Sequence, residues 1–133
     1  MTPGISFFVE GHPVPKQSFV YDGNGHGHAK PEVKIWQTLV RLRCAEDMML
    51  AGYDMITGEL ELDLGFILPD KRRRDLDNLS KAVCDALNGM LYKDDSQIVK
   101  LTITKHYTGT VGVYVTARPI EDGRTVITKR HKP

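Results

Sequence analysis

The stretch GELELDLGFIL, from Gly58 to Leu68, alternates between acidic and apolar residues from Glu59 to Leu64. Successive side chains of a β-strand point to opposite faces, so this pattern predicts a strand with one buried face. Such a face has to be covered by other elements of the fold. The buried face would carry Leu60, Leu62, Leu64 and Phe66, and the opposite face Glu59, Glu61 and Asp63.

Three further segments have the period of a strand. The short apolar run Ile5 to Val9 ends before Gly11 and Pro13. SQIVKLTITKHY alternates through Val99, Leu101 and Ile103, and VGVYVTA alternates through Val111, Val113, Val115 and Ala117. Because only Thr108, Gly109 and Thr110 link these last two strands, we expect them to pair as a β-hairpin.

A first helix is predicted between Pro31, which suits the first helical turn, and Gly52, which suits the position after the last. Its apolar residues form two stripes. One stripe faces the core of the domain. The second faces either a partner chain, which would make the protein a homodimer, or a wider core. The first consists of Val33, Trp36, Val40, Cys44 and Met48, and the second of Ile35, Leu39, Leu42 and Met49.

A second helix is expected from about Leu76 to Gly89. One stripe of this helix should pack on the sheet. The predicted order is β-α-β-α-β-β, an α+β domain in which two helices cover one face of a mixed four-stranded sheet. A length of 133 residues suits a single domain, residues 1–119, followed by a frayed basic tail, residues 120–133. The stripe of the second helix that should pack on the sheet consists of Leu79, Val83, Ala86, Leu87 and Met90.

Composition excludes several classes of protein. No apolar run approaches the roughly 20 residues needed to cross a bilayer, and the N-terminus lacks the pattern of a signal peptide. Cys44 and Cys84 form neither a CxxC pair nor a disulfide framework, which favours the reduced cytoplasm. The net charge of +1 does not by itself indicate a nucleic-acid-binding protein, so that inference depends on local clustering.

Residues 11–31 are rich in Gly, Pro and His without a period, and we expect a long loop. Lys16 and Lys30 are its candidate DNA contacts, and a plain surface loop is an equal alternative. The pair His26 and His28 is a weak metal signal.

The segment KRRRDLDNLSK places basic and acidic residues side by side. If extended geometry persists to Asp77, the carboxylates of Asp75 and Asp77 converge where strand gives way to helix. Carboxylates from YKDDSQ, further along, would join them if the chain turns back or if a second subunit supplies them. Converging carboxylates suit Mg²⁺ or Mn²⁺. The proposed phosphate contacts are Lys71, Arg72, Arg73 and Arg74.

Each of these motifs has a simpler interpretation. A DxD pair at a helix start is often only an N-cap. A KRRR run is usually a solvated turn. The i,i+4 pairs that Lys81 forms with Asp77 and Asp85 are ordinary helix-surface pairs, and Asp94–Asp95 is compatible with a polar turn.

The combination of PDKRRRDLDNLSKAVCDALNG with DDSQIV, and GHPVPKQS near the start, resembles the RusA-type Holliday junction resolvases of prophages and bacteria. The resemblance implies a homodimeric, Mg²⁺-dependent endonuclease of recombination and repair that resolves four-way DNA junctions by paired nicks. It implies Asp75, Asp77 and Asp95 as metal-binding carboxylates and Lys81 as the essential lysine. Asp95 is favoured over Asp94, because the second aspartate of the DD pair is the family's position.

Two departures accompany the resemblance. The connection NGMLYK is short, and the N-terminal loop is rich in Gly and His rather than strongly basic. Two other functions stay open: a non-catalytic module that binds branched DNA, and a metal-dependent nuclease acting on other branched DNA.

Overall fold

The computed structural model describes residues 3–16, 19–21 and 27–120. Its central element is a mixed four-stranded sheet in the order β1-β6-β4-β5. The elements are, in chain order, β1 (Ile5–Glu10), β2 (Phe19–Tyr21), β3 (Gly27–Ala29), α1 (Pro31–Ala51), β4 (Leu60–Ile67), α2 (Leu76–Leu87), the 3₁₀ turn η1 (Asp95–Gln97), β5 (Ile98–His106) and β6 (Gly112–Pro119).

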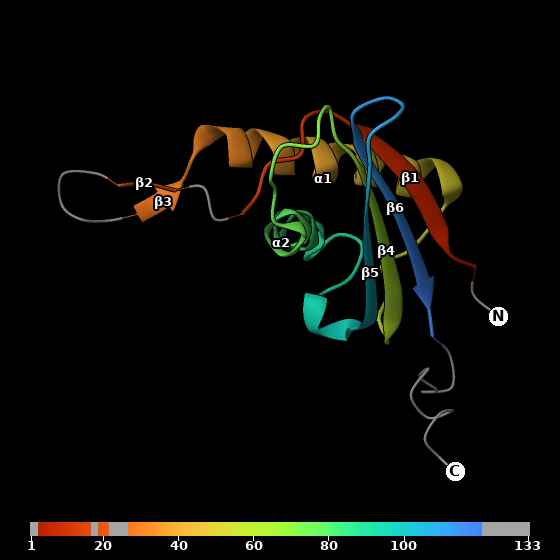
Figure 1. Cartoon of the computed structure of the whole chain (residues 1–133). Coiled ribbons are helices and arrows are strands. Elements are labelled where there is room, and N and C mark those ends of the chain that lie inside the picture. The colour runs from red at the N-terminus through yellow and green to blue at the C-terminus, as the bar shows by residue number, and fades with distance from the viewer. Residues whose placement is uncertain (1–2, 17–18, 22–26, 121–133) are drawn as a thin grey trace, which may run out of the picture.

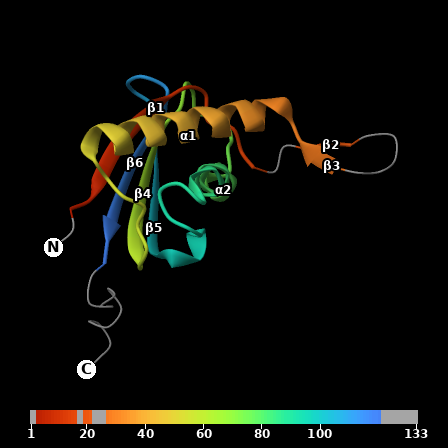
Figure 2. The same ribbon diagram turned by 180° about the vertical axis from the view of Figure 1, so that it is seen from behind.

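Both helices lie on the same face of the sheet, as Figures 1 and 2 show. α1 runs across the strands and packs on β1 and on α2, while α2 packs against β5. The core between them holds the inward residues of β4, from Leu60 to Phe66, together with Trp36 and Leu79. The predicted α+β class, with a mixed four-stranded sheet and two helices on one face, is confirmed.

The expected hairpin between the last two strands is wrong. β5 pairs with β4 in parallel, and β6 pairs with the other edge of β4 in antiparallel. β4 therefore lies between β5 and β6. The connection through Gly109, with a φ of 109°, passes close to the side chain of Ile67 at the end of β4. A short link between β5 and β6 is sufficient because it only has to pass over the end of β4.

The predicted long loop after β1 contains a second, two-stranded sheet. β2 and β3 pair in antiparallel, and Figure 1 shows them projecting away from the four-stranded sheet. His26 lies outside the described residues, and so do residues 121–133, which make up most of the predicted tail. Ile120 is described, and its N–H donates to the carbonyl of Glu59 at 2.8 Å.

α1 begins and ends close to where Pro31 and Gly52 predict. Gly52 is in the left-handed conformation (φ 61°) and caps the helix. The first apolar stripe is buried, except that Met48 is only partly covered. The second stripe is exposed: Ile35 is 61%, Leu42 64% and Met49 76% accessible. Among the described residues, neither helix is long and apolar enough to cross a membrane.

α2 packs against both the sheet and α1, and polar side chains of α1 hold it there. Gln37 Nε2 donates to the carbonyl of Ala82 at 3.0 Å. Arg41 Nη1 donates to the carbonyls of Ala86 at 2.7 Å and Asn88 at 3.0 Å. The last carbonyls of a helix have no partner within it, so Arg41 supplies the bonds that the end of α2 lacks.

Candidate active site

Asp75 is the N-cap of α2. Its Oδ1 accepts a hydrogen bond from the backbone N–H of Asp77 at 2.9 Å, and its Oδ2 accepts from Asn78 Nδ2 at 3.2 Å. The backbone is extended at Asp75, and the helix starts at Leu76. Extended geometry therefore does not persist to Asp77, and the condition under which the two carboxylates would converge on an extended segment is not met. The N-cap, one of the simpler interpretations, is what the structure shows for Asp75.

Asp77 and Lys81 lie one turn apart on the exposed side of α2. Asp77 Oδ2 and Lys81 Nζ are 3.7 Å apart, and their side chains are 71% and 54% exposed. At that exposure the pair contributes little to stability. Both side chains are accessible to a ligand.

The segment after α2 turns back toward these two residues and is held rigidly. The hydroxyl of Tyr92, which is fully buried, donates to the carbonyl of Cys84 at 2.8 Å. Gln97 Oε1 accepts from the N–H groups of Lys93 and Asp94, and its Nε2 donates to the carbonyls of Ile56 and Gly58. These bonds set the position of Asp95, the first residue of η1.

A cavity of about 440 Å³ brings the predicted residues of this single chain together. Asp77, Lys81 and Asp95 line it, whereas Asp75 and Asp94 are not among its lining residues. Asp95 thus returns to the face of α2 within one subunit. The other lining residues are Ser80, Cys84, Asp85, Ile98, Val99, Lys100 and Leu101.

The carboxylates of this cavity are hard oxygen donors, the kind that Mg²⁺ and Mn²⁺ prefer. In the described part of the chain, no three His, Cys, Asp or Glu side chains are grouped closely enough to hold a metal ion. Asp77 and Asp95 are the two carboxylates of the predicted set that share the cavity. The third predicted carboxylate, that of Asp75, belongs to the residue just before α2, two residues from Asp77 along the chain.

Cys84 lines the cavity without being a reactive thiol. Burial is the main cause that raises the pKa of its thiol to about 11; a hydrogen bond with Tyr92 opposes this rise, and the charges of Asp95 and Asp85 add to it. The thiol is therefore protonated at neutral pH, and the protonated form is a poor nucleophile.

Sequence reasoning missed one ion pair at the cavity. Asp85 was predicted only as a helix-surface partner of Lys81. In the structure its Oδ2 accepts from Lys16 Nζ at 2.5 Å, across 69 residues of sequence. Nothing in the spacing of the two residues indicates this contact, because they approach only when the segment that ends at Lys16 lies along α2.

The four basic residues before α2 differ in their environment. Arg74 turns back on its own loop: its guanidinium contacts Asp70 Oδ1 at 3.0 Å and donates to the carbonyls of Asp70 and Arg72, and its side chain is only 15% exposed. Lys71 lies over the ring of Tyr107, 5.5 Å from its centroid. Lys71, Arg72 and Arg73 are exposed. Lys30, also exposed, precedes α1 and is not among the residues that line the cavity.

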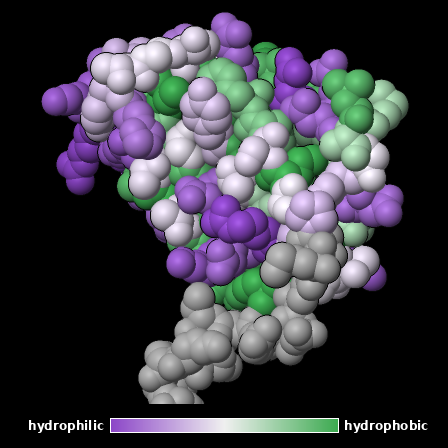
Figure 3. Space-filling model, turned by 90° about the vertical axis from the view of Figure 1, so that its right-hand side faces the viewer, coloured by the Kyte–Doolittle hydropathy of each residue, from purple (hydrophilic) through white to green (hydrophobic). Residues whose placement is uncertain are grey.

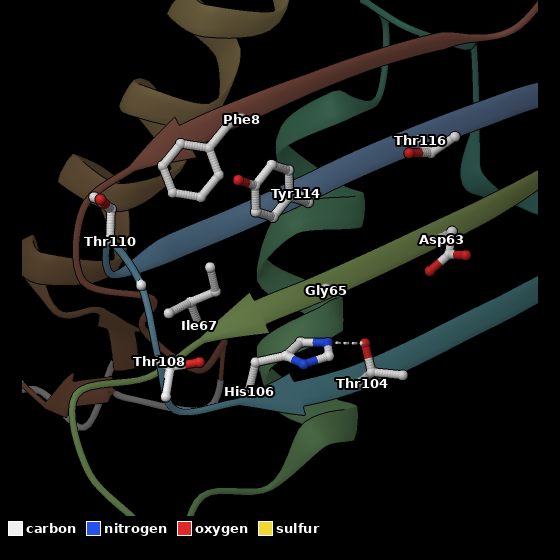
Figure 4. Close-up of a pocket in the computed structure, with 11 residues that line it drawn as sticks. Phe8, Asp63, Gly65, Ile67, Thr104, His106, Thr108, Thr110, Tyr114 and Thr116 are labelled. Carbon is white, nitrogen blue, oxygen red and sulfur yellow. Dashed lines mark hydrogen bonds between the residues drawn. The ribbon is translucent and has the colours of Figure 1, made fainter.

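A second depression, of about 610 Å³, lies on the opposite face of the sheet. Figure 4 shows that Tyr114 and Phe8 lie together there, and that His106 and Thr104 are hydrogen bonded. Figure 3 views the molecule from the right-hand side of Figure 1, and hydrophilic and hydrophobic residues are intermingled on that side. None of the predicted catalytic or DNA-binding residues lines this depression.

Comparison with known proteins gives a consistent result. The family Endodeoxyribonuclease RusA matches residues 10–118. The chain is similar to the crossover junction endodeoxyribonuclease RusA of Escherichia coli (strain K12), with 51% identity over 94 residues that cover 70% of this chain and 76% of the relative. It is also similar to the protein of the same name from Aquifex aeolicus (strain VF5), with 28% identity over 88% of this chain and 93% of the relative.

A third relative is the uncharacterized protein YqaN of Bacillus subtilis (strain 168), which is 28% identical over 87% of this chain and 96% of its own length. The class that these matches define is that of the endodeoxyribonucleases. The family match spans far more than half of the chain, and the chain belongs to the RusA family. The resemblance predicted from the sequence is confirmed, and membership implies a divalent metal requirement in general.

Proposed function

We propose that this protein is a Mg²⁺-dependent endonuclease that resolves four-way DNA junctions by paired, symmetric nicks in recombination and repair. Residues 1–119 would form its endonuclease domain and the cytoplasm would be its location. The observation that carries the proposal is the cavity where Asp77, Lys81 and Asp95 meet although two separate segments supply them. Membership of the RusA family supports the choice of substrate.

Asp75, Asp77 and Asp95 are the residues that would hold the metal, with Mn²⁺ as an alternative ion. A bound Mg²⁺ would polarise the scissile phosphate and lower the pKa of a water molecule. The ammonium of Lys81 would offset the negative charge that develops on the phosphate oxygens. Lys71, Arg72 and Arg73 would contact phosphates beside the cleaved bond.

Lys16 and Lys30 would also contact DNA under this proposal. Lys16 lies next to the cavity through its contact with Asp85, whereas Lys30 would meet a more distant part of a junction arm. Arg74 would contribute mainly by shaping the loop, since its guanidinium already contacts Asp70.

A homodimer would supply the two active centres that paired nicking requires. The exposed apolar residues of α1 support it, because rows of exposed apolar side chains are typical of protein–protein contact. A C₂ dimer would place the same face of α1 from both subunits together.

The experiment compares a four-way junction with linear, flap and three-way DNA in the presence of Mg²⁺, Mn²⁺ or EDTA. We expect symmetric nicks in the four-way junction alone, and none in EDTA. Asp95→Asn should lose cleavage while retaining junction binding. Asp94→Asn is the matched control: Asp94 is adjacent but does not line the cavity, so cleavage should persist.

Three outcomes would contradict the proposal. Equal cleavage of flap or linear DNA would indicate a nuclease for other branched DNA. Salt-dependent junction binding with no metal-dependent product would indicate a binding module. Cleavage by Asp95→Asn at the wild-type rate would refute the metal assignment.

A further inference from the structure

Lys16 is attached to α2 at two points. Its backbone N–H donates to the carbonyl of Asn78 at 3.0 Å, and its side-chain Nζ donates to Asp85 Oδ2 at 2.5 Å. Asn78 lies in the first turn of α2 and Asp85 about two turns further on. Lys16 is therefore held along α2 at a defined position.

Asp85 belongs to the wall of the candidate active site. It lines the cavity together with Asp77, Lys81 and Asp95. The side chains of Lys16 and Asp85 are 36% and 37% exposed, so both are partly shielded from water while remaining accessible. Asp85 accepts a hydrogen bond from the ammonium of Lys16, whereas Asp77 lies at the longer distance of 3.7 Å from the ammonium of Lys81.

The charges on this side of α2 alternate. Asp77, Lys81 and Asp85 follow one another at intervals of four residues and lie on one face of the helix. Lys81 pairs with Asp77 at 3.7 Å, and Lys16 pairs with Asp85. An ammonium has three donors, so Lys16 retains N–H groups for a second acceptor while Asp85 holds it.

We propose that Asp85 is a positioning residue, which holds the ammonium of Lys16 at the edge of the cavity so that it contacts a phosphate of the strand being cut. This inference rests on the proposed function. Lys16 then acts beside Lys81 on the same strand, and its backbone and side chain lie at one side of the path that the DNA follows.

Charge alone predicts a different result from positioning. Asp85→Asn removes one negative charge near the DNA, so electrostatics by itself predicts binding that is equal or tighter. Positioning predicts slower nicking in the same variant, because Lys16 no longer has a fixed place relative to the scissile phosphate. The rate of nicking and the affinity for DNA should therefore change independently.

The experiment uses the full chain with a four-way junction. Single-turnover nicking is measured in Mg²⁺ at saturating enzyme, and junction affinity is measured in EDTA. The variants are Asp85→Asn, Lys16→Gln and the double variant. We expect about a tenfold loss of nicking rate in each single variant, and no further loss in the double variant, because both changes remove one interaction.

Two controls separate positioning from a general loss of structure. Asp85→Glu keeps the charge and should restore most of the nicking rate. Glu61→Gln breaks a comparable partly exposed ion pair with Arg118, 3.4 Å long and on the opposite face of the sheet, and should nick at the wild-type rate. Thermal unfolding of all variants identifies any that fail to fold. If Asp85→Asn does, Asp85→Ala takes its place in the single and the double variant, because it also removes the acceptor of Lys16.

Nicking by Asp85→Asn at the wild-type rate would overturn the inference. Rate losses that multiply in the double variant would overturn it as well, since they would mean that Lys16 and Asp85 act independently. If the wild-type protein nicks no junction, the proposed function itself has failed. The wild-type arm thus distinguishes the two failures.

Discussion

The guanidinium of Arg74 lies 3.0 Å from the carboxylate of Asp70, four residues earlier, and closes the loop between β4 and α2. Lys105 of β5 donates to the carbonyl of Arg74 at 2.7 Å and ties this loop to the sheet. The hydrogen bond from the N–H of Arg72 contributes most to lowering the pKa of Asp70, and the contacts with Arg74 lower it further. The loop that leads into the candidate active site is thus shaped by its own charged residues.

Replacing Arg74 should therefore affect folding, whereas replacing Arg73 should affect DNA binding. Arg74→Ala removes the ion pair with Asp70 and two hydrogen bonds to backbone carbonyls of the loop, and we expect a lower free energy of unfolding. Arg73→Ala, the exposed control, should unfold like the wild type. It should also reduce the slope of log affinity against log salt concentration by about one, the loss of one phosphate contact. Urea unfolding and binding titrations check both. Equal stability of the two variants would contradict the structural role of Arg74.

Asp75 has a structural role that can be separated from its chemical role. Asparagine caps helices about as well as aspartate, whereas alanine costs about 1 kcal/mol. We expect Asp75→Asn to match the wild type in urea unfolding and Asp75→Ala to be less stable. Both should lose cleavage, and Asp75→Asn should still bind the junction, because the proposed function needs the carboxylate. If Asp75→Asn cleaves normally, the residue is an N-cap and nothing more.

Gln97 should control activity from outside the cavity. Its side chain bonds to four backbone groups, two in the turn that carries Asp94 and two at Ile56 and Gly58. Gln97→Ala leaves these groups unpaired, and we expect a loss of about 1–3 kcal/mol in stability together with slower nicking. Ser96→Ala, at an exposed neighbouring position, is the control. Nicking by Gln97→Ala at the wild-type rate would show that Asp95 does not depend on this turn.

Stability should fall at alkaline pH because of two buried thiols. Burial raises the pKa of Cys44 to about 12 and that of Cys84 to about 11, from 9.0. Below pH 9 both thiols are protonated in the folded and in the unfolded protein, so they cause no pH dependence of the free energy of unfolding. Above pH 9 only the unfolded state releases these protons, and the free energy of unfolding falls by up to about 1.4 kcal/mol per pH unit for each thiol.

Urea unfolding between pH 8 and pH 10.5 checks this expectation. The double variant Cys44→Ala, Cys84→Ala should be less stable at pH 8, but its stability should decline less steeply as the pH rises. Some decline should remain, because burial also raises the pKa of Tyr92. Parallel pH profiles for the two proteins would contradict the assignment to the thiols.

The exposed face of α1 should determine the oligomeric state. Leu42 is 64% and Ile35 61% exposed, and a charge at either position costs little in a monomer. We expect Leu42→Glu to convert the proposed dimer into a folded monomer, measured by analytical ultracentrifugation. Lys34→Glu changes charge at an exposed position outside this apolar row and should remain dimeric. A wild-type protein that sediments as a monomer at micromolar concentration would contradict the proposed dimer.

Periodicity predicted the local elements well. The alternation from Leu60 to Phe66 gave the central strand, and Pro31 with Gly52 marked the limits of α1. These predictions succeed because the apolar residues of a buried face recur at regular intervals in the sequence. The motif around Asp75 was sufficient to predict the family.

Contacts between distant elements were not predictable in this way. The interaction of Arg41 with the end of α2 and that of Lys16 with Asp85 join residues with no periodic relation. The hairpin expected through Gly109 was wrong for the same reason: a short link limits the distance between two strands without choosing their partners. The crossover through α2 places β5 in parallel beside β4, and β6 then takes the other edge.

The sequence by itself determined the four strands of the main sheet, the two helices, the α+β class, the family and the residue types available for chemistry. The tertiary structure decided which of those residues meet. It placed Asp95 with Asp77 and Lys81 in one subunit, and it assigned Asp75 to the start of α2 and Asp85 to Lys16. The physical reason is that burial patterns act over a few neighbouring residues, whereas a cavity wall depends on how the return after α2 and the segment that ends at Lys16 pack against one helix.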